Sequence, residues 1–124
     1  MTPVLRYVLD ENLRGPLWRA IQQHNSQSTF PLDAVRVGDP PDLPGGTVDP
    51  DILVWAEREA RIFVSLDKST LPGHLAHHLQ QGRHSPGIFI VIASRKLRDI
   101  LDYLIYTAYA GHPLDYADGI RFIP

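Results

Sequence analysis

The sequence predicts an α/β fold with three layers, in which helices cover both faces of a mostly parallel five-stranded sheet. Short apolar runs alternate along the chain with segments whose apolar residues recur at helical spacing, in the order β-α-β-α-β-α-β-α-β. The runs contain few polar residues, as is typical of strands buried on both faces. The composition, 44% hydrophobic and 21% charged, is that of an ordinary globular chain, and 124 residues suit a single domain over residues 1–124.

The expected strands are apolar runs that stop at polar or turn residues. The run YVL stops at Asp10, and the run RIFVSL stops at Asp67. The strongest run, GIFIVIA, is followed by Ser94. We therefore expect strands at residues 4–9, 33–37, 61–66, 87–93 and 120–123.

Each expected helix has an apolar stripe and recognisable ends. The first helix follows the motif LDEN. The second has Asp49 as its N-cap and Pro50 at its first helical position, directly after the irregular loop GDPPDLPGGTV. The third stops near Gly82, and the fourth is expected to begin at a Ser94 cap and to end at Gly111.

The composition excludes several classes of protein. The chain has no cysteine, which rules out a disulfide scaffold, a cysteine-ligated zinc site and thiol catalysis. The longest unbroken apolar run covers only residues 88–93, whereas a membrane-spanning helix needs about 20 apolar residues. Asp10, Glu11 and Arg14 occupy the place of the apolar stretch of a signal peptide. We therefore expect a soluble, cytoplasmic protein without a membrane partner.

Aspartates follow two of the expected strands and begin one expected helix. Asp10 and Asp67 come directly after strands, so both belong to the carboxyl edge of the sheet, where α/β proteins bind ligands. Asp49 and Asp51 begin the helix that leads into the Asp67 strand and should lie near the same edge. Carboxylates that meet repel unless a cation lies between them, and oxygen ligands suit Mg²⁺ or Mn²⁺. The alternative is that each aspartate caps a helix or faces solvent.

At these residues the sequence resembles a known family. The strings YVLDEN, DPDIL and RIFVSLD recur at this spacing in PIN-like domains, which are relatives of VapC-like ribonucleases. The resemblance continues through DKSTLPGHLAHHLQQGRHSPGIFIV and covers nearly the whole chain. It implies a Mg²⁺- or Mn²⁺-dependent endoribonuclease of the kind that forms the toxin of a toxin–antitoxin pair. RNA and an antitoxin protein are then the expected partners.

The resemblance also assigns roles to residues. It matches Asp10, Asp49 and Asp67 to the catalytic, metal-holding acids, with Asp51 as the near alternative to Asp49. Many PIN-like domains carry a fourth acid where this chain has Ser69. Four further residues are candidates for supporting the site. Ser69 and Thr70 could bind metal directly or through water, and Glu11 and Asn12 either cap the following helix or support the metal or a phosphate.

A basic stretch follows Asp67. Residues 68–98 contain five lysines and arginines, four histidines and no acid, whereas residues 39–59 are rich in acids. The net charge of −2 argues against strong non-specific nucleic-acid binding, so this segregation matters. The expected RNA contacts in the stretch are Lys68, His74, His77 and Arg83. The alternatives are a solvated surface and a zinc site made by a histidine pair.

The last long helix carries Tyr103, Tyr106 and Tyr109 away from its apolar stripe. Exposed aromatic side chains are enriched at protein interfaces, so these tyrosines predict a homodimer or an antitoxin contact, with partnerless surface tyrosines as the alternative.

Two other functions stay open. The chain could be a non-catalytic interaction module that keeps the PIN-like fold, since Ser69 replaces an acid. It could also be a receiver-like phosphoacceptor domain, since acids follow the first and third strands. Receivers, however, place a lysine after the fifth strand, where this chain offers only Arg121.

Overall fold

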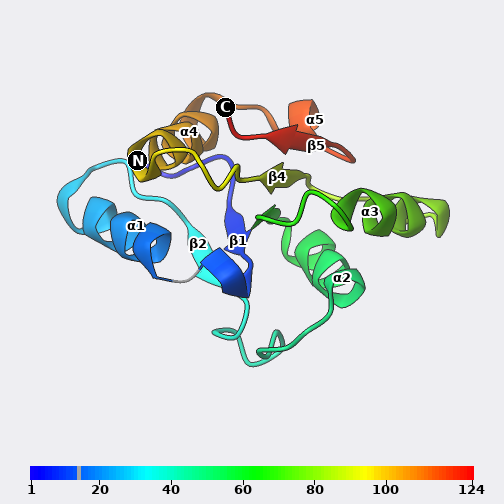
Figure 1. Ribbon diagram of the computed structural model, residues 1–124. Helices are drawn as coiled ribbons and strands as arrows, with labels where there is room; N and C mark the ends of the chain where they lie inside the picture. The colour runs from blue at the N-terminus through cyan, green and yellow to red at the C-terminus, as the bar shows by residue number, and fades with distance from the viewer. Residues whose placement is uncertain (14) are drawn as a thin grey trace.

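In the computed structural model, which describes residues 1–13 and 15–124, five parallel strands form one sheet in the order β2-β1-β3-β4-β5 (Figure 1). Every neighbouring pair is parallel. The α/β fold class and the parallel sheet predicted from the sequence are therefore confirmed. The strands are β1 (Tyr7–Leu9), β2 (Ala34–Arg36), β3 (Ile62–Ser65), β4 (Ile88–Ile90) and β5 (Ile120–Phe122).

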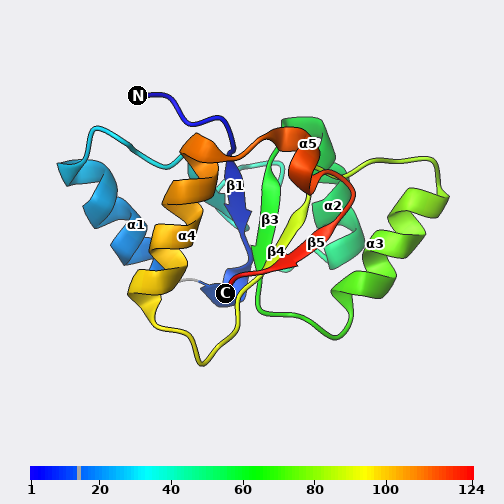
Figure 2. The same cartoon turned by 90° about the horizontal axis from the view of Figure 1, so that it is seen from above.

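Helices cover both faces of this sheet. A core of buried side chains on one face is closed by α1 and α4, and a second core on the other face is closed by α2 and α3 (Figure 2). Two short elements were not predicted: a 3-10 turn, η1, and a four-residue helix, α5. The helical elements are η1 (Glu11–Leu13), α1 (Pro16–Gln27), α2 (Asp49–Glu59), α3 (Leu71–Gln80), α4 (Leu97–Ala110) and α5 (Pro113–Tyr116).

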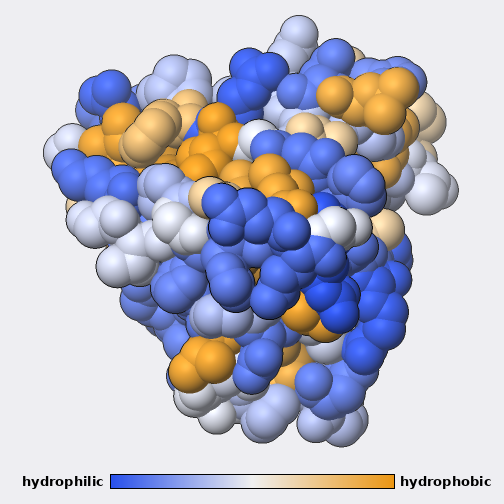
Figure 3. Space-filling model, turned by 90° about the vertical axis from the view of Figure 1, so that its right-hand side faces the viewer, coloured by the Kyte–Doolittle hydropathy of each residue, from blue (hydrophilic) through white to orange (hydrophobic). Residues whose placement is uncertain are grey.

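Alternation along the strands builds both cores. Tyr7 and Leu9 point to the α1/α4 side, and Val8 between them points to the α2/α3 side. All three side chains are fully buried. Charged and polar residues cover much of the outer surface on the side of α3 and β5, where apolar groups form separate patches (Figure 3). Because the inner strands β1, β3 and β4 have no solvated face, polar groups near them are confined mainly to the strand ends.

Two predicted helix caps are wrong by one or two residues. The N-cap of α2 is Val48, whose carbonyl oxygen accepts the backbone N–H groups of Asp51 and Ile52. Asp49 is therefore the first residue of the helix and does not cap it. The N-cap of α4 is Lys96 rather than Ser94, because a turn closed by the Arg95 N–H donating to the Ile92 carbonyl comes between β4 and the helix.

The prediction of three outward-facing tyrosines on α4 is also wrong. The Tyr103 ring packs edge-on against Phe89, with 5.4 Å between ring centroids. The Tyr109 ring packs edge-on against Phe30 at 5.3 Å, and its hydroxyl donates to the Pro31 carbonyl. Only Tyr106 of the three is exposed, at 69%. The loop after α1 and the edge of the sheet cover the other two, so an aromatic interface on α4 loses most of its basis.

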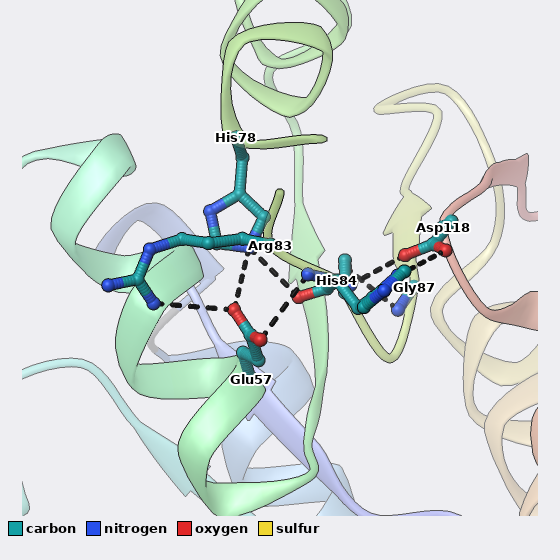
Figure 4. A network of polar contacts seen from close by, with 7 residues as sticks. Glu57, His78, Arg83, His84, Gly87 and Asp118 are labelled. Atoms are coloured by element: carbon teal, nitrogen blue, oxygen red, sulfur yellow. Dashed lines mark hydrogen bonds and ion pairs between the residues drawn. The ribbon is translucent and has the colours of Figure 1, made fainter. Parts of the chain in front are cut away.

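A polar network closes the amino edge of the sheet on the α2/α3 side (Figure 4). The Glu57 carboxylate accepts hydrogen bonds from the Arg83 guanidinium at 3.5 Å and from the His84 backbone N–H at 3.3 Å. Nε2 of the buried His78 lies 3.1 Å from Glu57 and 2.9 Å from the His84 carbonyl oxygen, so this nitrogen carries the proton. The His84 ring donates to Asp118 at 2.9 Å. The network ties α2 and the α3–β4 loop to the turn before β5.

We predict that the ion pair at the end of this network stabilises the fold only over a limited pH range. The hydrogen bond to Asp118 raises the pKa of His84, so its contribution is complete below about pH 6.5 and is lost as the pH rises through the raised value. The backbone N–H of Ser85 and the His84 ring lower the pKa of Asp118, so its contribution is lost as the pH falls below about 3.8. Urea unfolding of His84→Gln should therefore differ from wild type near about pH 5.5 and converge with it near about pH 9. An equal difference at both pH values would contradict this prediction.

A second prediction concerns the core. The fully buried Phe89 lies 5.3 to 6.0 Å, between ring centroids, from Tyr7, Tyr103 and Tyr116. Phe89→Ala should lower the free energy of unfolding by about 3–5 kcal/mol in urea denaturation. The control Phe122→Ala, at a side chain that is 52% exposed, should cost less than about 1 kcal/mol. Similar costs for the two variants would show that Phe89 is not a central core residue.

Candidate functional site

The sheet order creates a switch point beside β1. The chain leaves β1 for β2 on one side and later enters β3 on the other side. In open α/β sheets, ligands bind outside the carboxyl ends of the strands at such a point. Asp10 directly follows β1, and Asp67 lies two residues beyond the end of β3. The two aspartates therefore lie at the same edge of the sheet and on either side of the switch point.

A buried serine links these two aspartates. The hydroxyl of Ser65, the last residue of β3, donates to Asp10 Oδ2 at 2.8 Å and accepts the Asp67 backbone N–H at 3.1 Å. The side chain of Ser65 is completely buried. Asp10 Oδ1 accepts the backbone N–H of Glu11 at 2.8 Å. Sequence reasoning missed Ser65, and the available signal was a hydroxyl residue within the otherwise apolar run RIFVSL.

The Asp67 carboxylate is held by the turn that leads into α3. Its Oδ1 accepts the backbone N–H groups of Ser69 and Thr70, each at 3.0 Å, and its Oδ2 accepts the Thr70 hydroxyl. These hydrogen bonds, led by that of the Thr70 hydroxyl, lower the pKa of Asp67. Ser69 and Thr70 therefore act on Asp67, which they keep ionised and oriented.

The Asp49 carboxylate completes the acidic corner, which we define as Asp10, Asp49 and Asp67. Within the described chain it makes no capping hydrogen bond. Partial burial raises the pKa of Asp49, and the negative charges of Asp10 and Asp67 raise it further, while His74 opposes them. Three carboxylates from three separate elements thus share one electrostatic environment, and His74 of α3 lies within range of it.

The donor chemistry of the acidic corner fits a hard divalent cation. A carboxylate has about four acceptor positions, of which Asp10 uses two. No lysine or arginine among residues 1–13 and 15–124 forms an ion pair with any of the three acids. However, no three His, Asp or Glu side chains in this part of the chain are arranged as a ready-made metal site. A cation would therefore have to draw the carboxylates together.

The two residues after Asp10 have different surroundings. Glu11 Oε1 accepts the Gly46 backbone N–H at 2.5 Å, which fixes the loop before α2 against the end of β1. Glu11 therefore helps to position Asp49 through this loop. Asn12 is exposed and lines an apolar hollow beside α1.

The other predicted site residues are spread along α2 and α3. Lys68 is exposed and adjoins Asp67 in sequence, whereas Asp51 and His77 line a groove of about 180 Å³ between the two helices, together with His74. Arg83 follows the end of α3 and pairs with Glu57 in the network at the amino edge. The structure therefore does not bring Arg83 to the acidic corner.

A zinc site made by the histidines of α3 has no support in the contacts they make. Nε2 of the buried His78 is taken by Glu57 and the His84 carbonyl oxygen, and His77 Nε2 pairs with Gln81 at 3.1 Å. The three imidazoles do not point to one position within the described residues.

The chain matches no protein-family model, no curated protein and no solved structure. Among residues 1–13 and 15–124, no helix has the length and apolar character needed to cross a bilayer.

We predict that Ser65 supports both the fold and the geometry of the corner. Ser65→Ala removes the donor to Asp10 and the acceptor for the Asp67 N–H, so it should lower the free energy of unfolding by about 1–3 kcal/mol. Ser94→Ala, at an exposed serine, is the matched control and should change it by less than about 0.5 kcal/mol. Urea denaturation measures both, and equal values would remove Ser65 from the site.

Proposed function

We propose that this chain is a PIN-like endoribonuclease that uses Mg²⁺ or Mn²⁺ to hydrolyse phosphodiester bonds in RNA. One observation carries the proposal: the negative charges of Asp10 and Asp67 act on Asp49 at the switch point of the sheet. Such a concentration of carboxylates is unfavourable unless protons or a cation compensate it. If these aspartates served only the fold, the folded protein would be more stable with their charges farther apart.

The chain's own residues have distinct tasks in this proposal. Asp10, Asp49 and Asp67 would hold the ion, which supplies an activated water and stabilises charge on a phosphoryl oxygen. The Ser65 hydroxyl fixes Asp10, and the Thr70 hydroxyl fixes Asp67. Lys68 directly follows Asp67 in sequence, and the charge of His74 acts on Asp49. In this proposal the Lys68 ammonium group and a His74 N–H group contact a phosphate of the RNA.

A non-catalytic interaction module is the second candidate. It is favoured by the finding that no three acidic or histidine side chains of the described residues form a ready-made metal site. The presence of Ser69 at the place of a fourth acid points the same way. This candidate predicts that millimolar metal does not bind.

A receiver-like phosphoacceptor has the same strand order, 2-1-3-4-5. Near the last strand, however, the chain offers only Arg121, where receivers carry a lysine. Phosphorylation by acetyl phosphate would be the result that favours this reading over the nuclease.

Calorimetric titration with Mn²⁺ tests the proposed function. Wild type should bind the ion, and Asp49→Asn and Asp67→Asn should each weaken binding by at least about tenfold, with matching loss of cleavage of single-stranded RNA. Asp51→Asn is the control, because Asp51 lies on the same helix, exposed, two residues from Asp49. Absence of heat with wild type at millimolar Mn²⁺ would leave the interaction module as the better reading.

Thermal unfolding gives a test that does not need RNA. Because the pKa of Asp49 is raised in the folded state, its ionised form destabilises the fold above that pKa. Asp49→Asn should therefore melt at a higher temperature than wild type in EDTA at about pH 7.5, and the difference should shrink as the pH falls. Added Mn²⁺ should raise the melting temperature of wild type and leave that of the variant nearly unchanged. A lower melting temperature for the variant in EDTA would show that Asp49 is a structural residue.

A further inference from the structure

An apolar hollow lies at the carboxyl edge of the sheet, between η1, α1 and α4. It has a volume of about 230 Å³, and most of its lining is aliphatic. Two of its lining residues adjoin the acidic corner in sequence: Leu66 directly precedes Asp67, and Asn12 follows Asp10 by two positions. The hollow therefore lies at the same edge of the sheet as the proposed cleavage site, on the side of α1 and α4.

Cationic residues are concentrated in the loop that borders this hollow and at the start of the helix that follows it. Arg95 lines it, and Lys96 and Arg98 follow at the start of α4. All three are exposed, and Arg98 is paired with Asp102 at 3.3 Å. Neither Arg95 nor Lys96 is ion-paired with a residue that the structure describes. Arg95 and Lys96 precede the first helical residue, Leu97, so these two cations belong to the loop between β4 and α4.

The hollow continues as a groove between α1 and α4. Leu97 lines both the hollow and a second depression of about 300 Å³, which His24 and Arg98 also line. The hollow and this depression therefore adjoin at Leu97, between α1 and α4.

We propose that this loop and hollow, Asn12, Leu66 and residues 91–97, bind a single-stranded segment of the substrate RNA. The inference rests on the proposed nuclease function and names the surface that holds its substrate. An unstacked base enters the aliphatic hollow, while Arg95 and Lys96 contact the phosphates on either side of it. The Asn12 amide, which offers both a donor and an acceptor, faces the edge of the base at the mouth of the hollow. A duplex is excluded, because its stacked bases are not free to enter.

The geometry favours this loop over α3 as the path of the RNA. Arg83, at the end of α3, is already paired with Glu57 at the other edge of the sheet. The β4–α4 loop instead presents two cations, neither paired with an acid of residues 1–13 or 15–124, at the same edge as the acidic corner. The sequence alone predicts RNA contacts along α3. The β4–α4 loop belongs to the same acid-free stretch, residues 68–98.

Fluorescence anisotropy tests this surface with a labelled single-stranded oligouridylate of about ten nucleotides, in EDTA so that no cleavage occurs. Arg95→Ser/Lys96→Ser should weaken binding by at least about tenfold and reduce the slope of log affinity against log salt by about 1.4, or 0.7 for each lost phosphate contact. The charge-matched control Arg83→Ser/Arg121→Ser should leave both quantities unchanged. If the control weakens binding and the loop variant does not, the inference is overturned.

A second variant separates the hollow from the charges. Ala93→Leu adds volume at the lining of the hollow without changing the charge. It should weaken binding of the oligouridylate while leaving the affinity for an abasic oligomer of the same length unchanged. Equal weakening for both oligomers would overturn the assignment of the hollow to a base.

Mn²⁺ calorimetry on the same variants distinguishes this inference from the proposed function. Arg95→Ser/Lys96→Ser should bind Mn²⁺ as wild type does, since neither side chain belongs to the acidic corner. If the protein binds Mn²⁺ but its affinity for RNA does not depend on Arg95 and Lys96, the inference is overturned and the nuclease proposal stands. RNA binding through the loop in a protein that binds no Mn²⁺ supports the surface and overturns the nuclease.

Discussion

The covering of both sheet faces by helices is the constraint that shapes the rest of this molecule. Each strand is short, and the three residues of β1 and of β4 are all buried. A charged side chain within these strands would lose its solvation, so the first places that tolerate one are the strand ends. This is why aspartates appear directly after β1 and just beyond β3. Ser65 is a polar residue inside the inner strand β3, and its hydroxyl is satisfied on both sides by the aspartates that follow β1 and β3.

Periodicity predicted the kinds of element and their sequence, but long-range contacts set the details. The first strand is shorter than predicted, because the backbone N–H groups of Val4 and Leu5 donate to the carbonyl of Ala108 and not to a neighbouring strand. The position of β1 between β2 and β3 is not contained in any local pattern. It depends on which face of the sheet each helix crosses as it connects two strands. The four-residue α5 is too short to produce a periodic signal.

The same distinction applies to the candidate site. Asp10 and Asp67 could be placed at one edge, because an acid after a parallel strand has a defined position. The environment of Asp49 could not be read in the same way, since the end of the preceding loop decides whether it caps α2 or begins it. Arg83 was placed near the acids because it is close to Asp67 in sequence. The ten residues of α3 rise about 15 Å, however, and carry the chain to the opposite edge.

An acidic corner and a cationic loop at the same edge of the sheet constrain how a polyanion could be bound. Without a cation, the charges of Asp10, Asp49 and Asp67 repel a phosphate, whereas Arg95 and Lys96 attract it. A divalent ion at the corner would reverse the first effect and leave the second unchanged. Under the proposed function, metal and RNA therefore bind with positive coupling, and by linkage each must strengthen the binding of the other by the same factor. A protein that used the loop alone for RNA would have no reason to keep three carboxylates beside it, because their repulsion would only weaken the complex.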